Sequence, residues 1–430
     1  MQKVLIITYY WPPAGGPGVQ RWLKFASYLP QFGITPIIYT PQNPSYPIVD
    51  DQLINEVPKG IEVIKEPIKE PYRKAALFSQ KDAKTISSGI IPKQEKQSLL
   101  QKSLLFIRGN FFIPDARKAW VAPSVKFLSQ YLVQHKIESI ITTGPPHSLH
   151  LIGLQLKKHL NVNWIADFRD PWTAISYHSE LKLLPQAKKR HLNLEKEVLQ
   201  SAHHIITTSF STQREFQQKT LQPVALITNG YEKEADPGVN LDSKFSLVHI
   251  GSLLSNRNPT VLWKVLRELI KDNPAFAEAF QLRMAGKVSQ EVLNVIEEYQ
   301  LNPYLKLDGY ISHKEALTVQ QSAQVLLLIE ADTKATRAII PGKLFEYIAA
   351  KRPILAIGPK VWDVQHIIDE TQSGSVLDYQ DYDVLKKSLL DYFKLYQQQK
   401  LISHSKSTLK YHRKSLTEAL SKIIFQYVDQ

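Results

Sequence analysis

Short apolar runs alternate with segments of helical periodicity along the whole chain. Each run holds three to five residues and is followed by a longer stretch with apolar side chains at helical spacing. An alternation of this kind favours an α/β fold built from open, mostly parallel sheets. The runs that we predict to be strands are Val4–Thr8, Thr35–Tyr39, Ile61–Ile64, Ser139–Thr143, Trp164–Ala166, His204–Thr208, Val224–Ile227, Ser246–Ile250, Gln281–Met284, Leu305–Leu307, Val325–Ile329, Ile354–Ile357 and Ser375–Leu377.

The length of the chain predicts two domains. A chain of 430 residues is too long for one compact core. The polar stretch 229–238 has turn-forming residues at both ends, and we interpret it as the linker. We predict Rossmann-like, doubly wound domains over residues 1–235 and 240–404, with a last helix at about 405–430 that packs on either of them. Two such domains would face each other across a cleft lined by the carboxyl ends of their strands.

Residues 341–357 carry the most informative local pattern. Pro341 and Gly342 predict a helix start, Lys343 and Glu346 fall in its first two turns, and an apolar strand follows a Pro-marked break. A helix start offers unpaired N–H groups to an anion, here together with a cation, and the carboxylate could bind a ribose diol. We interpret the segment as a binding site for a nucleotide diphosphate. The alternative is an amphipathic helix with solvated charges.

A glycine-rich turn follows the first predicted strand. The run 14–18 contains Gly15 and Gly16 and leads into a helical segment, a geometry that lets backbone N–H groups approach a phosphate or a sugar. The third glycine of the dinucleotide fingerprint would fall on Arg21, so the pattern argues against a NAD-dependent oxidoreductase. A tight turn without a ligand is the alternative.

In the second half, further candidate binding residues follow predicted strands. Gly251 and Ser252 come directly after one strand. The guanidinium of Arg257, a few residues later, could form two parallel hydrogen bonds to a diphosphate. Lys287 and Tyr310 follow the next two strands, and backbone groups around the tyrosine could frame a base.

In the first half, His147 and the run Asp167, Arg169 and Asp170 also follow predicted strands. The histidine or Asp170 could orient an acceptor hydroxyl or stabilise a sugar ring. For the histidine, the alternative is a helix-start residue that satisfies the backbone. For the three charged residues it is a structural ion-pair loop.

Positive charge is concentrated in the first half. The formal net charge is +13, and residues 59–126 hold 14 Lys and Arg against 6 Asp and Glu. Apolar clusters in this range are flanked by Lys102, Arg108, Arg117 and Lys118, a combination that suits an anionic membrane. The alternative is core packing with solvated charges. We expect no nucleic-acid binding, because no nucleic-acid motif accompanies the charge.

Composition bears on location and cofactors. The chain has no Cys, which fits the cytoplasm, and no stretch reaches the roughly 18 to 20 apolar residues that cross a bilayer. The first residues resemble neither a signal peptide nor a spanning helix. We expect a cytoplasmic protein, at the inner face of the cytoplasmic membrane if the basic range docks there. No histidine cluster has metal-ligand spacing, so we expect neither a metal nor a cofactor.

Taken together, the motifs resemble those of glycosyltransferase family 4, retaining nucleotide-sugar glycosyltransferases of the GT-B fold with two Rossmann domains. The resemblance covers nearly the whole length. It rests on residues 14–18, 228–230, 249–252 with Arg257, 309–310, and 343–347 with Pro353. The segments 143–148 and 167–172 are similar to those of bacterial members thought to build cell-surface polysaccharides.

The resemblance implies residue roles. Arg257 and Lys343 would contact the donor diphosphate, Glu346 the ribose, and His147 would lie near the reacting sugar carbon, with Asp170 as a second catalytic candidate. Further implied contacts with the donor are Gly15, Gly16, Gly251, Ser252, Lys287, Tyr310 and Leu344, and with the acceptor or sugar Asp167 and Arg169.

Two residues depart from the family pattern. The first Glu of its pair should fall at Ala338, and the Arg usual after the first glycine of the second domain is Ser252. Either Glu330 or Asp332 compensates for the missing carboxylate, or donor recognition is altered.

The implied activity is transfer of a sugar from a UDP- or GDP-linked donor to a glycan or lipid-linked acceptor, with retention, in cell-surface polysaccharide biosynthesis. Cations would stabilise the leaving diphosphate in place of a divalent metal. Two alternatives remain open. One is a non-catalytic protein that binds nucleotide sugars or glycans, which Ala338 and Ser252 favour, and the other is a GT-B nucleotide-sugar epimerase.

Overall fold

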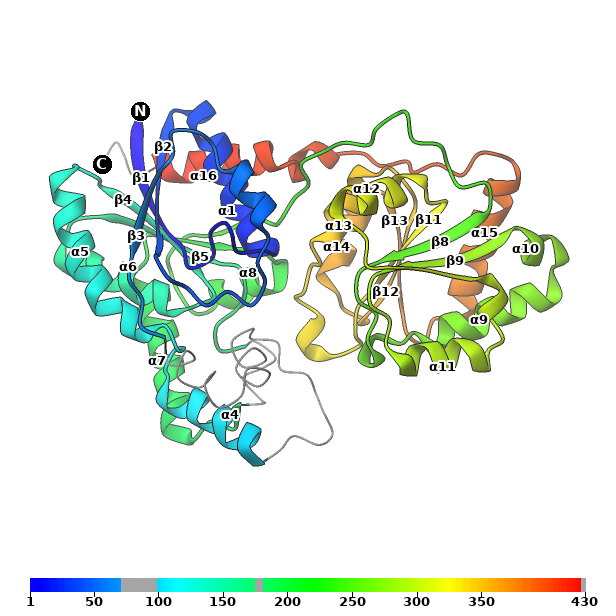
Figure 1. Cartoon of the computed structure of the whole chain (residues 1–430), viewed down its shortest axis with the longest axis horizontal. Helices are drawn as coiled ribbons and strands as arrows, with labels where there is room; N and C mark the ends of the chain where they lie inside the picture. Colours follow the sequence, from blue (N-terminus) through cyan, green and yellow to red (C-terminus); the bar gives the residue numbers. More distant parts are fainter. Residues whose placement is uncertain (71–98, 175–180, 427–430) are drawn as a thin grey trace. The chain divides into compact units, whose positions relative to one another are not determined.

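The computed structural model describes residues 1–70, 99–174 and 181–426, and the chain divides into two compact units (Figure 1). Unit 1 comprises Met1–Thr228 and Arg413–Gln430, and unit 2 comprises Asn229–His412. The stretch that we interpreted as a linker is therefore part of unit 2. There, the Tyr231 N–H donates to the Tyr411 carbonyl at 3.1 Å.

In the described part of unit 1, seven strands form one sheet in the order β3-β2-β1-β4-β5-β6-β7, and every neighbouring pair is parallel. The strands are β1 (Gln2–Ile7), β2 (Ile34–Pro41), β3 (Glu62–Glu66), β4 (Ser139–Gly144), β5 (Asn163–Phe168), β6 (His204–Thr207) and β7 (Val224–Leu226). The helices are α1 (Pro17–Tyr28), α4 (Leu99–Phe111), α5 (Val121–Gln134), α6 (Ser148–His159), α7 (Pro185–Ser201), α8 (Phe210–Gln217) and α16 (Arg413–Phe425).

Alternate residues of β1 enter two separate cores, because successive strand side chains point to opposite faces of a sheet. Leu5 and Ile7 join the core under α5, α6 and α7. Val4 and Ile6 join the core under α1 and α16. The C-terminal helix thus completes the hydrophobic covering of the sheet to which the first residues of the chain belong.

In unit 2, six described strands form a second parallel sheet in the order β10-β9-β8-β11-β12-β13. Its main hydrophobic core lies between this sheet and α9, α10, α11 and α15. The strands are β8 (Phe245–Ile250), β9 (Phe280–Ala285), β10 (Leu305–Gly309), β11 (Val325–Ile329), β12 (Ile354–Gly358) and β13 (Gly374–Asp378). The helices are α9 (Thr260–Asp272), α10 (Pro274–Ala279), α11 (Gln290–Glu298), α12 (His313–Ser322), α13 (Lys343–Ala349), α14 (Asp363–Thr371) and α15 (Tyr382–Gln397).

The predicted fold class is confirmed. All thirteen strands expected from the apolar runs are present, within a few residues at their ends, in two parallel sheets covered by helices. The last helix begins at Arg413, later than the predicted 405, because a short 3₁₀ turn over Thr408–Tyr411 precedes it.

Replacing Leu420 by Ala should destabilise unit 1 by about 2–5 kcal/mol, because this fully buried α16 side chain belongs to the core under α1. Hydrogen–deuterium exchange, followed by mass spectrometry, should show faster exchange in α1 peptides. Val133→Ala, on the exposed side of α5, is the matched control and should leave exchange unchanged. Unchanged α1 exchange in Leu420→Ala would contradict the assignment of α16 to this core.

Candidate functional site

In unit 2, two glycines bring the ends of three strands together. Gly251 and Gly286 follow β8 and β9 with φ of 112° and 123°, a region that favours glycine. A Cβ on Gly286 would lie 2.5 Å from the Gly251 carbonyl oxygen, so no side chain fits there. The Gly286 N–H donates to the Gly309 carbonyl at the end of β10 at 2.6 Å. The carboxyl edge of this sheet therefore presents bare backbone to a ligand.

Lys343, the first residue of α13, reaches this edge. Its Nζ donates to the Ile250 carbonyl at 2.9 Å, while the Tyr347 hydroxyl accepts a hydrogen bond from the Ile250 N–H at 3.0 Å. Burial lowers the pKa of Lys343 to about 8; the positive charge of Arg257 lowers it further, and the carboxylates of Glu330 and Glu346 oppose the shift. The ammonium group is thus held at the end of β8 beside a second cation.

Arg257 is oriented by a buried carboxylate. Its Nε lies 2.8 Å from Glu330 Oε1, which also accepts a hydrogen bond from the Ala331 N–H at 2.9 Å. Glu330 directly follows β11, the neighbour of β8, and its carbonyl accepts a hydrogen bond from the Tyr379 hydroxyl at 2.9 Å. The Arg257 side chain remains about one-third exposed. From the sequence we had predicted Glu330 only as one of two residues that could compensate for the carboxylate missing at Ala338.

Glu346 lies one turn after Lys343 and contacts α12. Its Oε1 is 3.0 Å from His313 Nε2, and its Oε2 accepts a hydrogen bond from Gln320 Nε2 at 3.0 Å. The carboxylate is about one-third exposed, so both a protein partner and a ligand can reach it. No sequence signal pointed to His313 or Gln320, because their role depends only on how α12 packs beside α13.

The other predicted donor-binding residues of unit 2 lie around this edge in different environments. Ser252, Lys287 and Tyr310 have exposed side chains. The side chain of Leu344 is buried, and its N–H donates to the Pro341 carbonyl at 3.0 Å. Donor contacts by these four residues stay predictions.

Gly15 and Gly16 belong to unit 1, in the turn between β1 and α1. The Gly15 N–H donates to the Ile48 carbonyl at 3.0 Å, and a Cβ on Gly15 would lie 2.8 Å from the Ile48 side chain. Gly16, with φ of 104°, caps the start of α1. Close packing and backbone geometry thus require both glycines, and their donor role stays a prediction.

Asp167 is bonded from three sides inside unit 1. Its Oδ1 lies 2.9 Å from Arg21 Nη2, and its Oδ2 accepts hydrogen bonds from Trp22 Nε1 at 2.9 Å and Thr143 Oγ1 at 2.8 Å. Arg21 also donates to the Thr228 carbonyl at 2.7 Å, and both charged side chains are buried. This geometry fits the structural ion-pair alternative, and a contact of Asp167 with a sugar stays a prediction.

The two residues that follow β5 stay near the surface. Arg169 donates to the Pro145 carbonyl and lies over the Tyr10 ring, 5.7 Å from its centroid. Asp170 is exposed.

His147 caps α6 and lies in an aromatic cluster. Its ring stacks on Trp172 with centroids 5.1 Å apart and planes 4° from parallel, and its side chain is buried. The Trp172 indole N–H in turn donates to His191 Nδ1 at 3.1 Å. The imidazole is therefore rigidly placed at the end of β4, and its catalytic role stays a prediction.

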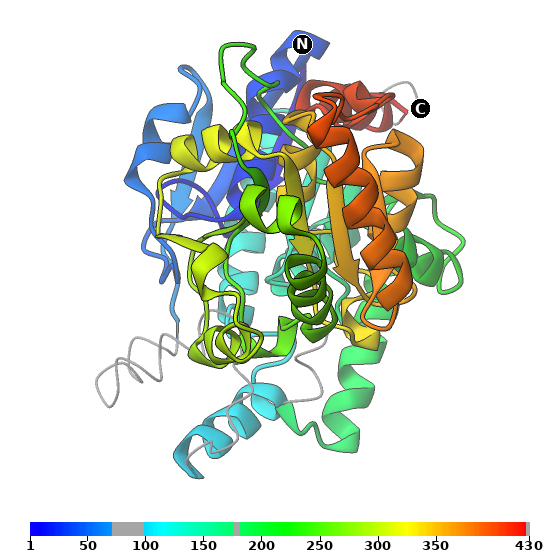
Figure 2. The same cartoon turned by 90° about the vertical axis from the view of Figure 1, so that its right-hand side faces the viewer.

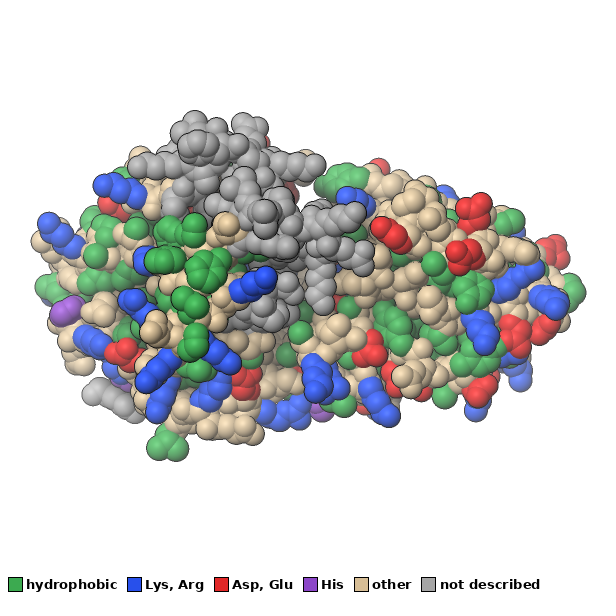
Figure 3. Space-filling model, turned by 90° about the horizontal axis from the view of Figure 1, so that it is seen from below, with side chains coloured by type: hydrophobic (Ala, Val, Ile, Leu, Met, Phe, Trp, Pro, Cys, Tyr) green, Lys and Arg blue, Asp and Glu red, His purple; other side chains and the backbone are tan. Residues whose placement is uncertain are grey.

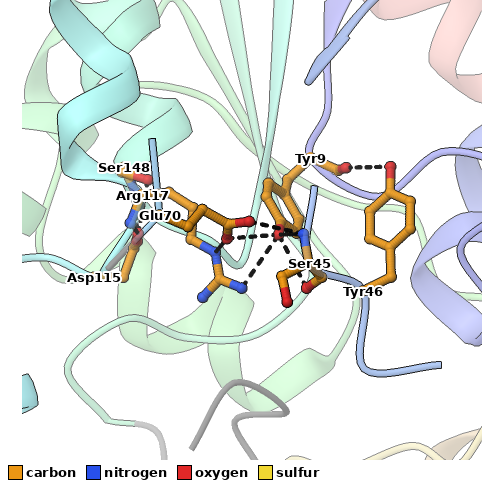
Figure 4. Close-up of polar contacts among 7 residues, drawn as sticks. All are labelled: Tyr9, Ser45, Tyr46, Glu70, Asp115, Arg117 and Ser148. Atoms are coloured by element: carbon orange, nitrogen blue, oxygen red, sulfur yellow. Dashed lines mark hydrogen bonds and ion pairs between the residues drawn. The ribbon is translucent and has the colours of Figure 1, made fainter. Parts of the chain in front are cut away.

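A second polar cluster holds the start of α6 (Figure 4). Buried Glu70 accepts hydrogen bonds from the Tyr9 hydroxyl at 2.8 Å and the Ser45 N–H at 2.7 Å, and its carboxylate lies 3.1 Å from Arg117 Nε. Asp115 accepts hydrogen bonds from the N–H and the hydroxyl of Ser148, both at 2.8 Å. No local pattern predicted this cluster, because its partners are far apart in the chain.

The predicted position of Arg117 at a membrane surface is wrong. We predicted this residue among the cations at a membrane surface, but it is buried and paired with Glu70. Residues 71–98 of the predicted membrane range lie outside the described residues.

Within residues 1–70, 99–174 and 181–426, no group of three or more His, Asp or Glu side chains is arranged to hold a metal ion. The closely spaced carboxylates Asp381 and Asp383 lie at the start of α15. Asp381 Oδ2 accepts a hydrogen bond from the Asp378 N–H at 2.8 Å.

No family model matches the chain, and no curated protein matches it in sequence. Solved structures match it over nearly its whole length. Sucrose-phosphate synthase from Thermosynechococcus elongatus is 14% identical, with 99% of each chain covered and a TM-score of 0.61. A glycosyltransferase from Rickettsia africae is 13% identical, with 99% of each chain covered and a TM-score of 0.59. HepE from Anabaena, in complex with UDP-glucose, is 12% identical over 99% of this chain and 100% of that chain, with a TM-score of 0.59.

At these identities the likeness shows the fold. The chain has two parallel-sheet α/β units of the kind found in GT-B glycosyltransferases.

Replacing Asp167 by Asn should destabilise unit 1 by about 3–5 kcal/mol, because it leaves the Arg21 charge buried without its partner. Exchange of β4 and β5 amides, measured by mass spectrometry, should rise. The double variant Arg21→Met/Asp167→Asn should lose less unfolding free energy than the sum of the losses in the two single variants, because it leaves no buried charge without a partner. Strict additivity would contradict a direct buried pair.

Lys343 should titrate near pH 8, and competitive labelling of amines with acetic anhydride as a function of pH should detect this. Arg257→Gln should raise the midpoint by removing a like charge, and Glu330→Gln should lower it by removing a carboxylate. Lys271, exposed on α9, gives the reference for reagent reactivity in the same digest. A midpoint that neither substitution moves would contradict the proximity of the three groups.

Proposed function

We propose that the chain is a glycosyltransferase that takes its sugar from a nucleotide-diphosphate donor bound by unit 2. The observation that carries this proposal is the pair of cations, Arg257 and Lys343, at the carboxyl end of β8, where Gly251 presents only backbone. A diphosphate between them would offset both the burial of the lysine and its repulsion by Arg257, the two causes that lower its pKa. The complex of the similar HepE structure with UDP-glucose supports a nucleotide sugar as the ligand.

These side chains match the chemistry of the leaving group. Cleavage of the bond between the sugar and the diphosphate develops negative charge on the diphosphate, and two fixed cations would stabilise it more as that charge grows. Glu346, which lies one helix turn after the lysine and contacts His313 and Gln320, would accept hydrogen bonds from the ribose. We propose that these cations act without a divalent metal.

We propose that unit 1 supplies the acceptor side. His147, Arg169 and Asp170 follow β4 and β5 at the carboxyl edge of its sheet, the edge at which open α/β sheets bind ligands. An exposed Asp170 carboxylate at this edge would exchange a proton with an acceptor hydroxyl. A glycan or lipid-linked acceptor, retention of configuration and a role in surface-polysaccharide synthesis are proposed from the family resemblance alone.

Arg257→Ala and Lys343→Ala should each weaken binding of the cognate nucleoside diphosphate by about tenfold or more, because each removes a charge-assisted hydrogen bond. The double variant should abolish measurable binding. Isothermal titration with UDP, GDP and their sugar conjugates measures this. Arg267→Ala and Lys271→Ala, basic residues of α9, are the matched controls and should bind as the unaltered chain does. Unchanged affinity in the double variant would overturn the proposal.

Product analysis separates this proposal from its alternatives. Purified protein given donor and a panel of glycan and lipid-linked acceptors should release nucleoside diphosphate in an acceptor-dependent manner. Asp170→Asn should lower that rate while leaving donor affinity unchanged. Donor binding without turnover on any acceptor would favour a non-catalytic binding protein, and conversion of the donor sugar without an acceptor would favour an epimerase.

A further inference from the structure

Helix α4 and the start of α7 together form one surface of unit 1. The Asn110 amide donates to the Lys182 carbonyl at 3.4 Å, and its Oδ1 accepts a hydrogen bond from the Leu184 N–H at 2.7 Å. Gly109 packs against the segment before α7, since a Cβ there would lie 2.8 Å from the Leu181 Cβ. Both views of the chain show the two helices projecting beyond the same end of the unit 1 sheet (Figures 1 and 2). We call residues 105–111 and 182–192 the α4–α7 surface.

Large apolar side chains of this surface are exposed to solvent. Ile107 and Phe111 lie one turn apart on α4 and are 44% and 63% exposed. Leu184 and Leu192, at the start of α7 and two turns later, are 45% and 44% exposed. Buried α7 side chains such as Ala187 and His191 point to the core instead. Clustered exposed apolar side chains of this size mark a binding surface.

Cations surround these apolar side chains. Residues 182–192 contain Lys182, Lys188, Lys189 and Arg190 and no acid, and all four side chains are exposed. Lys188 lies between Leu184 and Leu192 on one face of α7, at i+4 spacing from each. Seen from below, the part of the molecule formed by unit 1 shows Lys and Arg side chains intermixed with hydrophobic ones (Figure 3). The surface is therefore both apolar and cationic.

We propose that the α4–α7 surface docks on an anionic lipid bilayer. Exposed Phe, Ile and Leu side chains can enter the boundary between headgroups and acyl chains, while Lys and Arg side chains remain at the anionic headgroups. Among the described residues, no helix is long and apolar enough to cross a bilayer. The residues of α7 extend the membrane contact beyond the range 59–126 that the charge pattern indicated.

Charge alone would also suit a nucleic acid, but the apolar side chains favour the bilayer. Phosphate backbones are bound by cations and polar groups, and exposed leucines such as Leu184 and Leu192 add nothing to such a contact. Liposome binding that needs both side-chain types therefore distinguishes the two partners.

The experiment is co-sedimentation of the full chain with phosphatidylcholine vesicles, with and without phosphatidylglycerol. Binding should require phosphatidylglycerol and weaken with added salt. Lys188→Gln/Lys189→Gln/Arg190→Gln should lower the partition coefficient on the order of 100-fold, at roughly fivefold for each charge removed near the surface. Ile107→Ser/Phe111→Ser should lower it by about tenfold or more, because it removes apolar area without changing charge.

Matched substitutions in unit 2 serve as controls. Lys271→Gln/Lys394→Gln/Lys400→Gln removes the same charge from exposed positions, and Val361→Ser/Val384→Ser removes side chains that are 59% and 52% exposed. Neither control should change vesicle binding. Far-UV circular dichroism and hydrogen–deuterium exchange of β4 and β5 amides verify that each variant is folded, and neither readout depends on the donor proposal.

Three results would overturn the proposal. One is no sedimentation with anionic vesicles, and another is an equal loss in the unit 2 controls, which would mean non-specific attraction by net charge. The third is binding to a labelled oligonucleotide that the triple Gln variant abolishes and the Ser variant leaves intact, without vesicle binding, which would assign the surface to nucleic acid.

Discussion

The arrangement of unit 1 depends on one buried carboxylate, that of Asp167. A buried charge is costly unless it is paired and hydrogen-bonded, so Arg21, Trp22 and Thr143 must keep their positions around it. The contact fixes α1 against the ends of β4 and β5, and through Arg21 it also holds the Thr228 carbonyl at the end of the unit. The loops that carry His147, Arg169 and Asp170 leave from these same strand ends, so the contact of Asp167 with Arg21 helps to set their positions.

In unit 2, the candidate site holds two neighbouring cations instead of a buried pair of opposite charges. The carboxyl edge of its sheet places Lys343 on a neutral carbonyl and near Arg257. Burial lowers the pKa of the lysine, and the charge of Arg257 adds to that effect. Arg21 and Asp167 neutralise each other inside unit 1. In unit 2, Arg257 is paired with Glu330 but Lys343 donates to a neutral carbonyl, so the proposed diphosphate would stabilise both cations further. Gly251 and Gly286 leave room for that anion, because side chains there would occupy the approach to the strand ends.

The sequence predicted the elements well and the contacts poorly, for a physical reason. A short apolar run indicates a buried strand from adjacent residues alone, so the thirteen strands could be predicted without knowing which strands pair with one another. Asp167 and Asp170 follow the same strand and look alike in sequence, yet one is buried and the other exposed. The difference arises from Arg21, 146 positions away, which had been noted only as a mismatch to a glycine pattern. The contact of His313 with Glu346 likewise depends on packing between two helices.

The contacts of Glu330 decide whether it can replace the carboxylate that the family resemblance predicts at Ala338. Glu330 is buried, and its Oε1 accepts from both Arg257 and the Ala331 N–H. Releasing Arg257 to bind a diphosphate through its whole guanidinium would leave this carboxylate buried and unpaired, which is strongly unfavourable. The less costly arrangement keeps Arg257 Nε on Glu330 and turns the terminal amino groups toward the ligand. If the proposed donor binds here, Glu330 would orient the cation instead of contacting the donor sugar, and recognition of that sugar would come from groups other than the carboxylate pair of the family that the sequence resembles.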